Sequence, residues 1–173
     1  MTENDIVGYT VAYEQEEIQF PVYVVAVVGA VFLAAGVINA NPWLLLLAVP
    51  PAAAVYYNFP LIETGRPRLG AGQYGLFVEG LGLIQWRAID QIEMVPTDMR
   101  GIPSHELHVS LKIPVGDALI LDWRNRPLLR KGMRLPWSMK SKNVIRIALG
   151  VLDRPKGEIH ETFLRMWRFY RGQ

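Results

Sequence analysis

The residues best suited to chemistry lie near the middle of the chain, where histidines and a carboxylate occur close together. His105 and His108 flank Glu106 in a stretch whose apolar residues alternate. Residues three apart on a strand point to opposite faces, so these imidazoles are not placed to share a metal ion. The third histidine, His160, falls on an expected helix beside two glutamates, which is typical of a solvated face. We therefore expect structural or surface roles for all three histidines.

Two further patterns could serve catalysis, and each has a simpler explanation. Asp117 and Asp122 lie on either side of an expected strand, and paired carboxylates can perform acid–base chemistry. A turn acid and a strand-end acid are the ordinary interpretation of that spacing. Gly75, Gly80 and Gly82 are not followed by an expected helix, so they indicate turns or bulges and not a phosphate-binding loop. The chain contains no cysteine, which excludes disulfides, thiolate metal sites and cysteine nucleophiles. The sequence thus predicts no catalytic residue, metal or cofactor.

The strongest binding signal is a basic stretch, residues 124–146, which contains eight Arg or Lys residues and no acid. Apolar residues are interleaved with these cations. Such a run is often only a solvated surface, but each basic residue near an anionic leaflet gains about 1 kcal/mol, and Trp or Leu can bury among headgroups. We expect contact with anionic lipid headgroups or with a protein partner, in preference to nucleic acid. The predicted binding residues are Arg124, Arg126, Arg130, Lys131, Arg134, Trp137, Lys140 and Lys142.

An apolar segment earlier in the chain could hold these residues near a membrane. Residues 18–62 contain no Asp, Glu, Lys, Arg or His. As a helix, residues 20–38 would extend roughly 28 Å, close to the thickness of a bilayer's hydrocarbon core. The polar residues 39–42 then predict a turn, and residues 43–59 form a second apolar run. The sequence predicts a transmembrane helical hairpin over 18–62; a re-entrant hairpin and a hairpin buried in a soluble core are the alternatives.

Small residues recur along the first apolar run, at Gly29, Ala30, Ala34 and Gly36. Such positions allow helices to approach closely. They predict either packing of the two helices against each other or docking on another membrane protein, and the pattern does not separate the two.

The charges on either side of the hairpin are unequal. Residues 1–62 hold five acids and no base, whereas the remainder holds all 18 bases and the other 11 of the 16 acids. An acidic start argues against a signal peptide. Two spans place both termini on one side, and Arg66 and Arg68 directly follow the second span. The positive-inside tendency then predicts that both termini and the basic domain are cytoplasmic.

Outside the hairpin, the sequence predicts an acidic tail over 1–17, a linker over 63–72 and a separate domain over 73–173. Apolar runs flank Glu79-Gly80 as in a β-hairpin, and residues 105–113 alternate as in a half-buried antiparallel strand. The chain then ends in an amphipathic pattern. Its apolar stripe consists of Ile159, Phe163, Met166, Trp167 and Tyr170. Strands followed by one such helix indicate an α+β domain.

Residues 74–93 resemble the opening of bacterial pleckstrin-homology-like domains. In that family a strand, a glycine turn and a second strand lead into a W-x-x-I-x-x-I segment, which matches Trp86, Ile89 and Ile92. Helical spans before the domain and a final helix after it are also common there, so the resemblance covers about residues 20–173. The long basic segment from Trp123 to Lys142 departs from the pattern. The resemblance implies a partly open antiparallel β-barrel capped by a helix, binding lipids or proteins and carrying no catalytic activity.

These observations together predict a non-enzymatic protein of the bacterial inner membrane. Its expected role is that of an accessory, scaffold or assembly subunit of a larger integral membrane complex. A module that binds anionic lipids and acts alone is the first alternative, and an enzyme acting on a membrane substrate is the second.

Overall fold

The computed structural model of the chain describes residues 8–14, 16–63, 66–99 and 102–172. It divides into two compact units. We call the first the β unit, which comprises Met1–Tyr13, Gly65–Arg126 and Leu135–Gln173. The second is the hairpin unit, which comprises Glu14–Thr64 and Pro127–Arg134. Each unit is described separately below.

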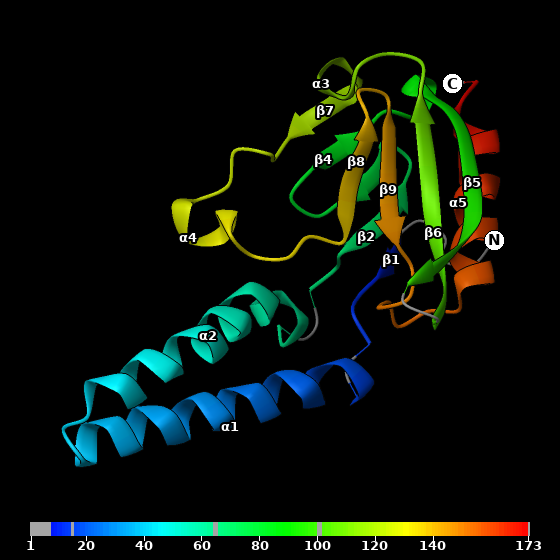
Figure 1. Ribbon diagram of the computed structural model, residues 1–173. Helices are drawn as coiled ribbons and strands as arrows, with labels where there is room; N and C mark the ends of the chain where they lie inside the picture. Colours follow the sequence, from blue (N-terminus) through cyan, green and yellow to red (C-terminus); the bar gives the residue numbers. More distant parts are fainter. Residues whose placement is uncertain (1–7, 15, 64–65, 100–101, 173) are drawn as a thin grey trace. The chain divides into compact units, whose positions relative to one another are not determined.

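The hairpin unit is built on two long apolar helices that lie side by side (Figure 1). Helix α1 covers Glu16–Ile38 and α2 covers Pro42–Asn58, followed by a short 3-10 turn at Phe59–Leu61. The turn between the helices is the polar one expected from the sequence. The Asn41 side chain accepts a hydrogen bond from the Trp43 N–H at 3.0 Å, and Pro42 occupies the first helical turn, where a missing N–H costs nothing.

The two glycines on α1 are the positions where α2 comes closest. A Cβ at Gly36 would lie 2.6 Å from Leu45 Cδ2, and one at Gly29 would lie 3.3 Å from Pro51 Cβ. Ala30 and Ala34 are instead exposed. In the structure the two glycines thus lie where α2 packs on α1, while the two alanines lie on the exposed surface of α1.

Both helices are apolar on their exposed surfaces. Two segments are long and apolar enough to cross a membrane: Gln19–Ile38 in α1, and Pro42–Leu61 in α2 and the 3-10 turn that follows it. Few residues of either segment are buried. Phe20, Val31 and Leu46 are among their exposed side chains. Exposed apolar surface on this scale is typical of a surface that faces a membrane or binds a protein.

The β unit contains two antiparallel sheets. The first has the strand order β1-β2-β3-β4-β7, and the second has the order β5-β6-β9-β8. The strands of the first sheet are β1 Tyr9–Val11, β2 Leu69–Gly72, β3 Gly75–Val78, β4 Gly82–Ile84 and β7 Leu119–Asp122. Those of the second are β5 Ile89–Met99, β6 Ile102–Leu111, β8 Trp137–Ser141 and β9 Val144–Ala148. Short helical turns lie at Trp86–Ala88 and, as α3, at Val115–Ala118.

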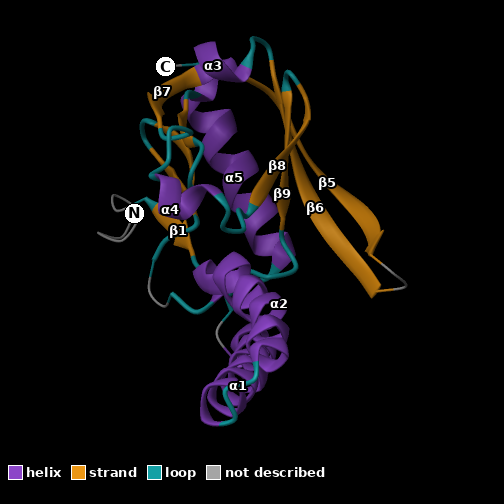
Figure 2. Cartoon of the chain, turned by 60° about the vertical axis from the view of Figure 1, so that its left-hand side comes forward, coloured by secondary structure: helices purple, strands orange, loops and turns teal. Residues whose placement is uncertain are grey.

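The C-terminal helix α5, Lys156–Tyr170, packs against both sheets, touching β2 in the first and β5 in the second (Figure 2). Ile159 and Phe163 of its predicted apolar stripe are fully buried. They join a core drawn from both sheets, which includes Leu76 and Leu107. The helix therefore closes the space between the sheets, as the amphipathic pattern predicts.

Several expected elements are confirmed, and three are corrected. The turn at Glu79-Gly80 joins β3 to β4, with Gly80 at φ 69°. The predicted linker over 63–72 ends early, because Leu69–Gly72 is a buried strand; Thr64 and Gly65 lie outside the described residues. The acidic tail over 1–17 contributes strand β1 and the start of α1, although residues 1–7 and Gln15 lie outside the described residues.

The third correction concerns β6. Leu107, Val109 and Leu111 face the core as expected, but Glu106 and His108 on the opposite face are also buried. Both lie in the middle of the sheet, since β5 and β9 pair with β6 on either side. Neighbouring side chains therefore cover a face that the alternation predicts to be open.

Candidate functional site

The structure distributes the predicted basic residues over both units. Arg130, Lys131 and Arg134 belong to the hairpin unit, while the other five predicted binding residues belong to the β unit. Residues 127–134, which we call the docked segment, leave the β unit and fold with the transmembrane-length helices. The segment contains the one-turn helix α4, Leu128–Lys131.

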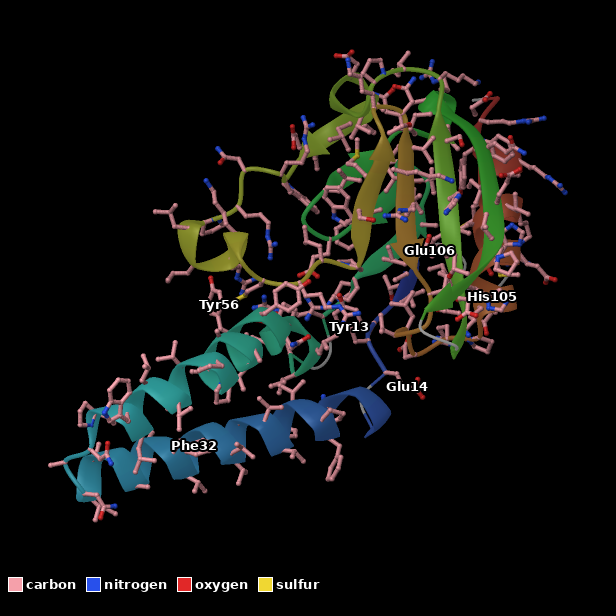
Figure 3. All side chains as sticks on the ribbon, in the orientation of Figure 1. Tyr13, Glu14, Phe32, Tyr56, His105 and Glu106 are labelled. Atoms are coloured by element: carbon pink, nitrogen blue, oxygen red, sulfur yellow. The ribbon has the colours of Figure 1, made fainter. Side chains whose placement is uncertain are left out.

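Hydrogen bonds hold the docked segment against the last turn of α2. The Tyr56 hydroxyl donates to the Leu129 carbonyl at 2.8 Å, and the Arg134 N–H donates to the Tyr57 carbonyl at 2.9 Å. Figure 3 shows Tyr56 directed from α2 toward this segment. Gly132 allows the close approach, because a Cβ there would lie 3.0 Å from Tyr56 Cε1. The backbone of the segment is thus fixed at the end of α2.

An ion pair adds to this attachment. Arg130 Nη2 lies 3.2 Å from Glu63 Oε1, beyond the end of α2. Glu63 pairs with one of the segment's three cations, and residues 127–134 themselves contain no acid. Lys131 is exposed and Arg134 is half-buried.

The two leucines of the docked segment are exposed despite being apolar. Leu128 is 81% exposed and Leu129 is 78% exposed. Neither was among the residues that the sequence singled out for binding, and neither were Tyr56 and Glu63. The available signal was Pro127 followed by two leucines inside a basic run, which predicts a short amphipathic turn but not its attachment to α2.

In the β unit, the predicted binding residues Arg124 and Trp137 make side-chain hydrogen bonds within the protein. Arg124 forms a bidentate pair with Asp122, with Nη2 to Oδ2 at 2.6 Å and Nε to Oδ1 at 3.0 Å. This hydrogen bond lowers the pKa of Asp122 from 3.8 to about 2. Trp137 donates its indole N–H to the Glu79 carbonyl at 2.9 Å.

Arg126 and the two lysines of the β unit have different surroundings. Arg126 is half-buried and lies against Gly80, where a Cβ would be 3.5 Å from its Cδ. Lys140 and Lys142 are exposed around the end of β8. These lysines and Arg124 are the exposed residues of the predicted site in the β unit.

A buried ionic cluster in the β unit escaped the sequence analysis. Arg68 is fully buried, forms an ion pair with Glu79, and places its guanidinium 4.8 Å from the centroid of the Tyr13 ring. Its backbone N–H donates to the Val11 carbonyl at 2.8 Å, next to the junction of β1 and β2. The sequence placed Arg68 in a solvated linker, because an arginine beside glycines and a proline carries no sign of burial.

His108 and Glu106 of β6 form a small polar pair. His108 Nε2 lies 3.2 Å from Glu106 Oε2, and Arg146 Nη1 lies 4.0 Å from the same oxygen. His105 is an odd number of residues away from Glu106, on the opposite face of the strand. Within the described part of the chain, no group of three or more His, Cys, Asp or Glu residues is placed to hold a metal ion.

Strand β1 is attached to the C-terminal part of the β unit as well as to β2. The Tyr9 hydroxyl donates to Glu158 Oε1 at 3.0 Å, and its ring packs edge-on against Phe163. Burial, followed by this hydrogen bond to a carboxylate, raises the pKa of Tyr9. The Ala12 N–H donates to Asp153 Oδ1 at 3.1 Å. The segment before α1 is therefore an integral part of the β unit.

Comparisons of this chain with protein-family models, with curated proteins and with solved structures gave no match. Functional conclusions therefore rest on the chain's own residues.

Proposed function

We propose that the chain is an integral membrane protein whose two apolar helices cross the bacterial inner membrane as a hairpin. The proposal places the β unit and both termini in the cytoplasm. The length, composition and exposed apolar surface of α1 and α2 support membrane insertion. The bases that follow the second helix support a cytoplasmic β unit, because cytoplasmic loops carry an excess of Arg and Lys.

The pairing of β1 with β2 is the observation that carries this proposal. Val11 lies opposite Leu69 and Tyr9 opposite Ala71, although α1 and α2 separate the two strands in the sequence. Two paired strands must lie in one aqueous compartment, so an odd number of membrane crossings between them is excluded. A hairpin satisfies this requirement, and a single span does not.

We further propose that the β unit is a pleckstrin-homology-like binding domain that serves a larger membrane complex as an accessory, scaffold or assembly subunit. Two antiparallel sheets closed by a C-terminal helix are compatible with that fold. Trp86, Ile89 and Ile92 of the W-x-x-I-x-x-I segment are all buried, as a structural motif requires. Solvent-exposed Tyr74, Leu121 and Trp123 supply apolar surface that favours binding.

The docked segment favours a second candidate, in which the protein binds anionic lipid on its own. Its cations and exposed leucines have the composition of an interfacial membrane contact. The two candidates share the anchor and differ in whether a protein partner is needed.

Cysteine accessibility tests the topology, since the natural chain has no cysteine. With Thr2→Cys or Gln173→Cys, an impermeant thiol reagent should fail to label intact cells, whereas Ala40→Cys in the turn between the helices should react. Labelling of Gln173→Cys from outside would contradict the cytoplasmic assignment. Protection of all three positions would instead indicate a re-entrant hairpin.

Native electrophoresis of gently solubilised membranes tests the accessory role. With a tag after Gln173, the protein should migrate far above a monomer or small homo-oligomer, together with other proteins. A band that contains this chain alone in several mild detergents would favour the lipid-binding candidate.

A further inference from the structure

We infer that the docked segment, residues 127–134, is a second membrane-binding element that inserts Leu128 and Leu129 into an anionic bilayer and binds lipid phosphate through its cations. This inference rests on the proposed membrane insertion of the hairpin. It names the ligand, the anionic headgroup region of a bilayer, and the residues that contact it.

The first line of argument concerns depth in the membrane. Aromatic side chains gather where α2 ends, at Tyr56, Tyr57 and Phe59, and all three are exposed. Tyrosine favours the boundary between hydrocarbon and headgroups, because its ring is apolar and its hydroxyl is polar. Tyr56 and Tyr57 are also the residues that hydrogen-bond the docked segment. The contacts that position the segment therefore hold it at the same level as this aromatic belt.

The second line concerns the exposed leucines. Leu128 and Leu129 are adjacent on one helical turn and have almost no cover within the protein. The main-chain carbonyl of Leu129 is used by Tyr56, so the backbone is fixed while both side chains are left outward. A fixed apolar pair at the membrane boundary gains free energy by leaving water for the outer part of the acyl chains.

The third line concerns charge complementarity. Arg130, Lys131 and Arg134 follow these leucines within the docked segment, and Glu63 neutralises part of the charge of Arg130. A positive segment beside an inserted apolar pair is complementary to phosphate groups of an anionic leaflet. Arginine and lysine side chains can bury their apolar stems and keep their charges at the phosphate level.

Fluorescence of labelled single-cysteine variants tests the inference in the full-length protein, reconstituted in bilayer nanodiscs. Leu128→Cys and Leu129→Cys would carry an environment-sensitive fluorophore. With about 30% phosphatidylglycerol, both labels should shift to the blue and be quenched by spin-labelled lipids. Arg165→Cys on α5 is the matched control, because it is exposed and lies outside both the docked segment and the predicted binding residues. Its label should stay accessible to aqueous iodide.

A label at Leu33→Cys, on the exposed surface of α1, separates the two proposals. If that label is quenched by lipid while those at Leu128 and Leu129 respond only to iodide, the hairpin is inserted and the present inference is wrong. If the label at Leu33 is not quenched by lipid, the proposed membrane anchor itself is wrong. Labels at Leu128 and Leu129 that escape both quenchers would indicate a protein interface, which also overturns the inference.

Charge variants test the phosphate contact. Lys131→Gln with Arg134→Gln leaves the Glu63–Arg130 pair intact. In anionic nanodiscs it should lower the ratio of inserted to withdrawn leucines on the order of thirtyfold. In purely zwitterionic nanodiscs the same variant should have little effect. Arg165→Gln with Arg168→Gln, on the exposed side of α5, removes equal charge from the β unit outside the predicted binding residues and should leave lipid quenching at Leu129 unchanged. An equal loss from both double variants, or equal insertion with and without anionic lipid, would overturn specific phosphate binding.

Discussion

The hairpin unit and the β unit place the same kinds of residue in opposite positions. In the β unit, large aliphatic side chains such as Leu107 and Ile147 are fully buried, whereas in the hairpin unit Leu46 and Val31 are exposed. The same contrast holds for ion pairs. Arg68 of the β unit is enclosed with Glu79, while Arg130 of the hairpin unit meets Glu63 at the surface. The β unit thus buries its large apolar side chains internally, whereas the hairpin unit leaves many of them exposed to its surroundings.

The largest expected difference between the two units comes from truncating a leucine in each. Leu107→Ala empties a fully buried site and should lower the free energy of unfolding by about 3 kcal/mol. Leu46→Ala, at a position 59% exposed, should change it by less than about 0.5 kcal/mol. Urea unfolding of the full chain in mild detergent, followed by tryptophan fluorescence, measures both. Equal losses would mean that Leu46 is part of a soluble core, and the contrast between the units would fail.

Removal of one charge from each ion pair should give losses of unfolding free energy that differ between the two units, but by less than those of the leucine truncations. Arg68→Met leaves Glu79 without its buried partner and should cost about 3 kcal/mol, whereas Arg130→Met should cost less than about 1 kcal/mol because both partners are partly exposed. The double variant Arg68→Met, Glu79→Gln should recover about 1 kcal/mol of the loss. The same unfolding measurement applies. If the double variant is less stable than Arg68→Met alone, the cost does not come from the uncompensated charge of Glu79.

The smallest expected effect depends on pH and concerns the attachment of β1. The folded state raises the pKa of Tyr9, so it binds the phenolic proton more tightly than the unfolded chain does. The resulting stabilisation is complete below the unfolded pKa of about 10 and is lost as the pH rises above it. Tyr9→Phe should cost about 1 kcal/mol at neutral pH, and this difference from the natural chain should narrow above about pH 10. If the difference in unfolding free energy between Tyr9→Phe and the natural chain stays constant across that range, the raised pKa of Tyr9 does not contribute to stability.

The sequence was most informative where one physical requirement dominates. The absence of charge over residues 18–62 and the Asn41-Pro42 start of α2 predict both helices, whose bounds agree closely with the structure. Alternation predicts β6, and the helical stripe predicts α5. These patterns are local, so the residues that carry them lie within a few turns or one strand.

The sequence was least informative where distant segments meet. Strand β1 covers only Tyr9–Val11, and its partner β2 is reached only after the whole hairpin. The burial of Arg68 depends on Tyr13 and Glu79, and the docked segment depends on Tyr56, which is more than seventy residues away from Leu129. Composition predicts that the basic stretch contacts a membrane surface, and this stays a prediction. It could not indicate which cations would be engaged by Asp122 or Glu63, because such pairing is set by tertiary structure.

The place of the hairpin between two neighbouring strands also bears on how the protein is made. Strand β1 ends at Val11 and leaves the ribosome first, but its partner β2 starts only at Leu69. The first sheet therefore cannot be completed until both apolar helices have been synthesised. If the N-terminal segment were translocated, β1 and β2 would be separated by the membrane, and β2 would keep an unpaired edge open to proteases and aggregation. Under the proposed hairpin topology, this sheet can therefore close only when β1 and β2 lie on the same side of the bilayer.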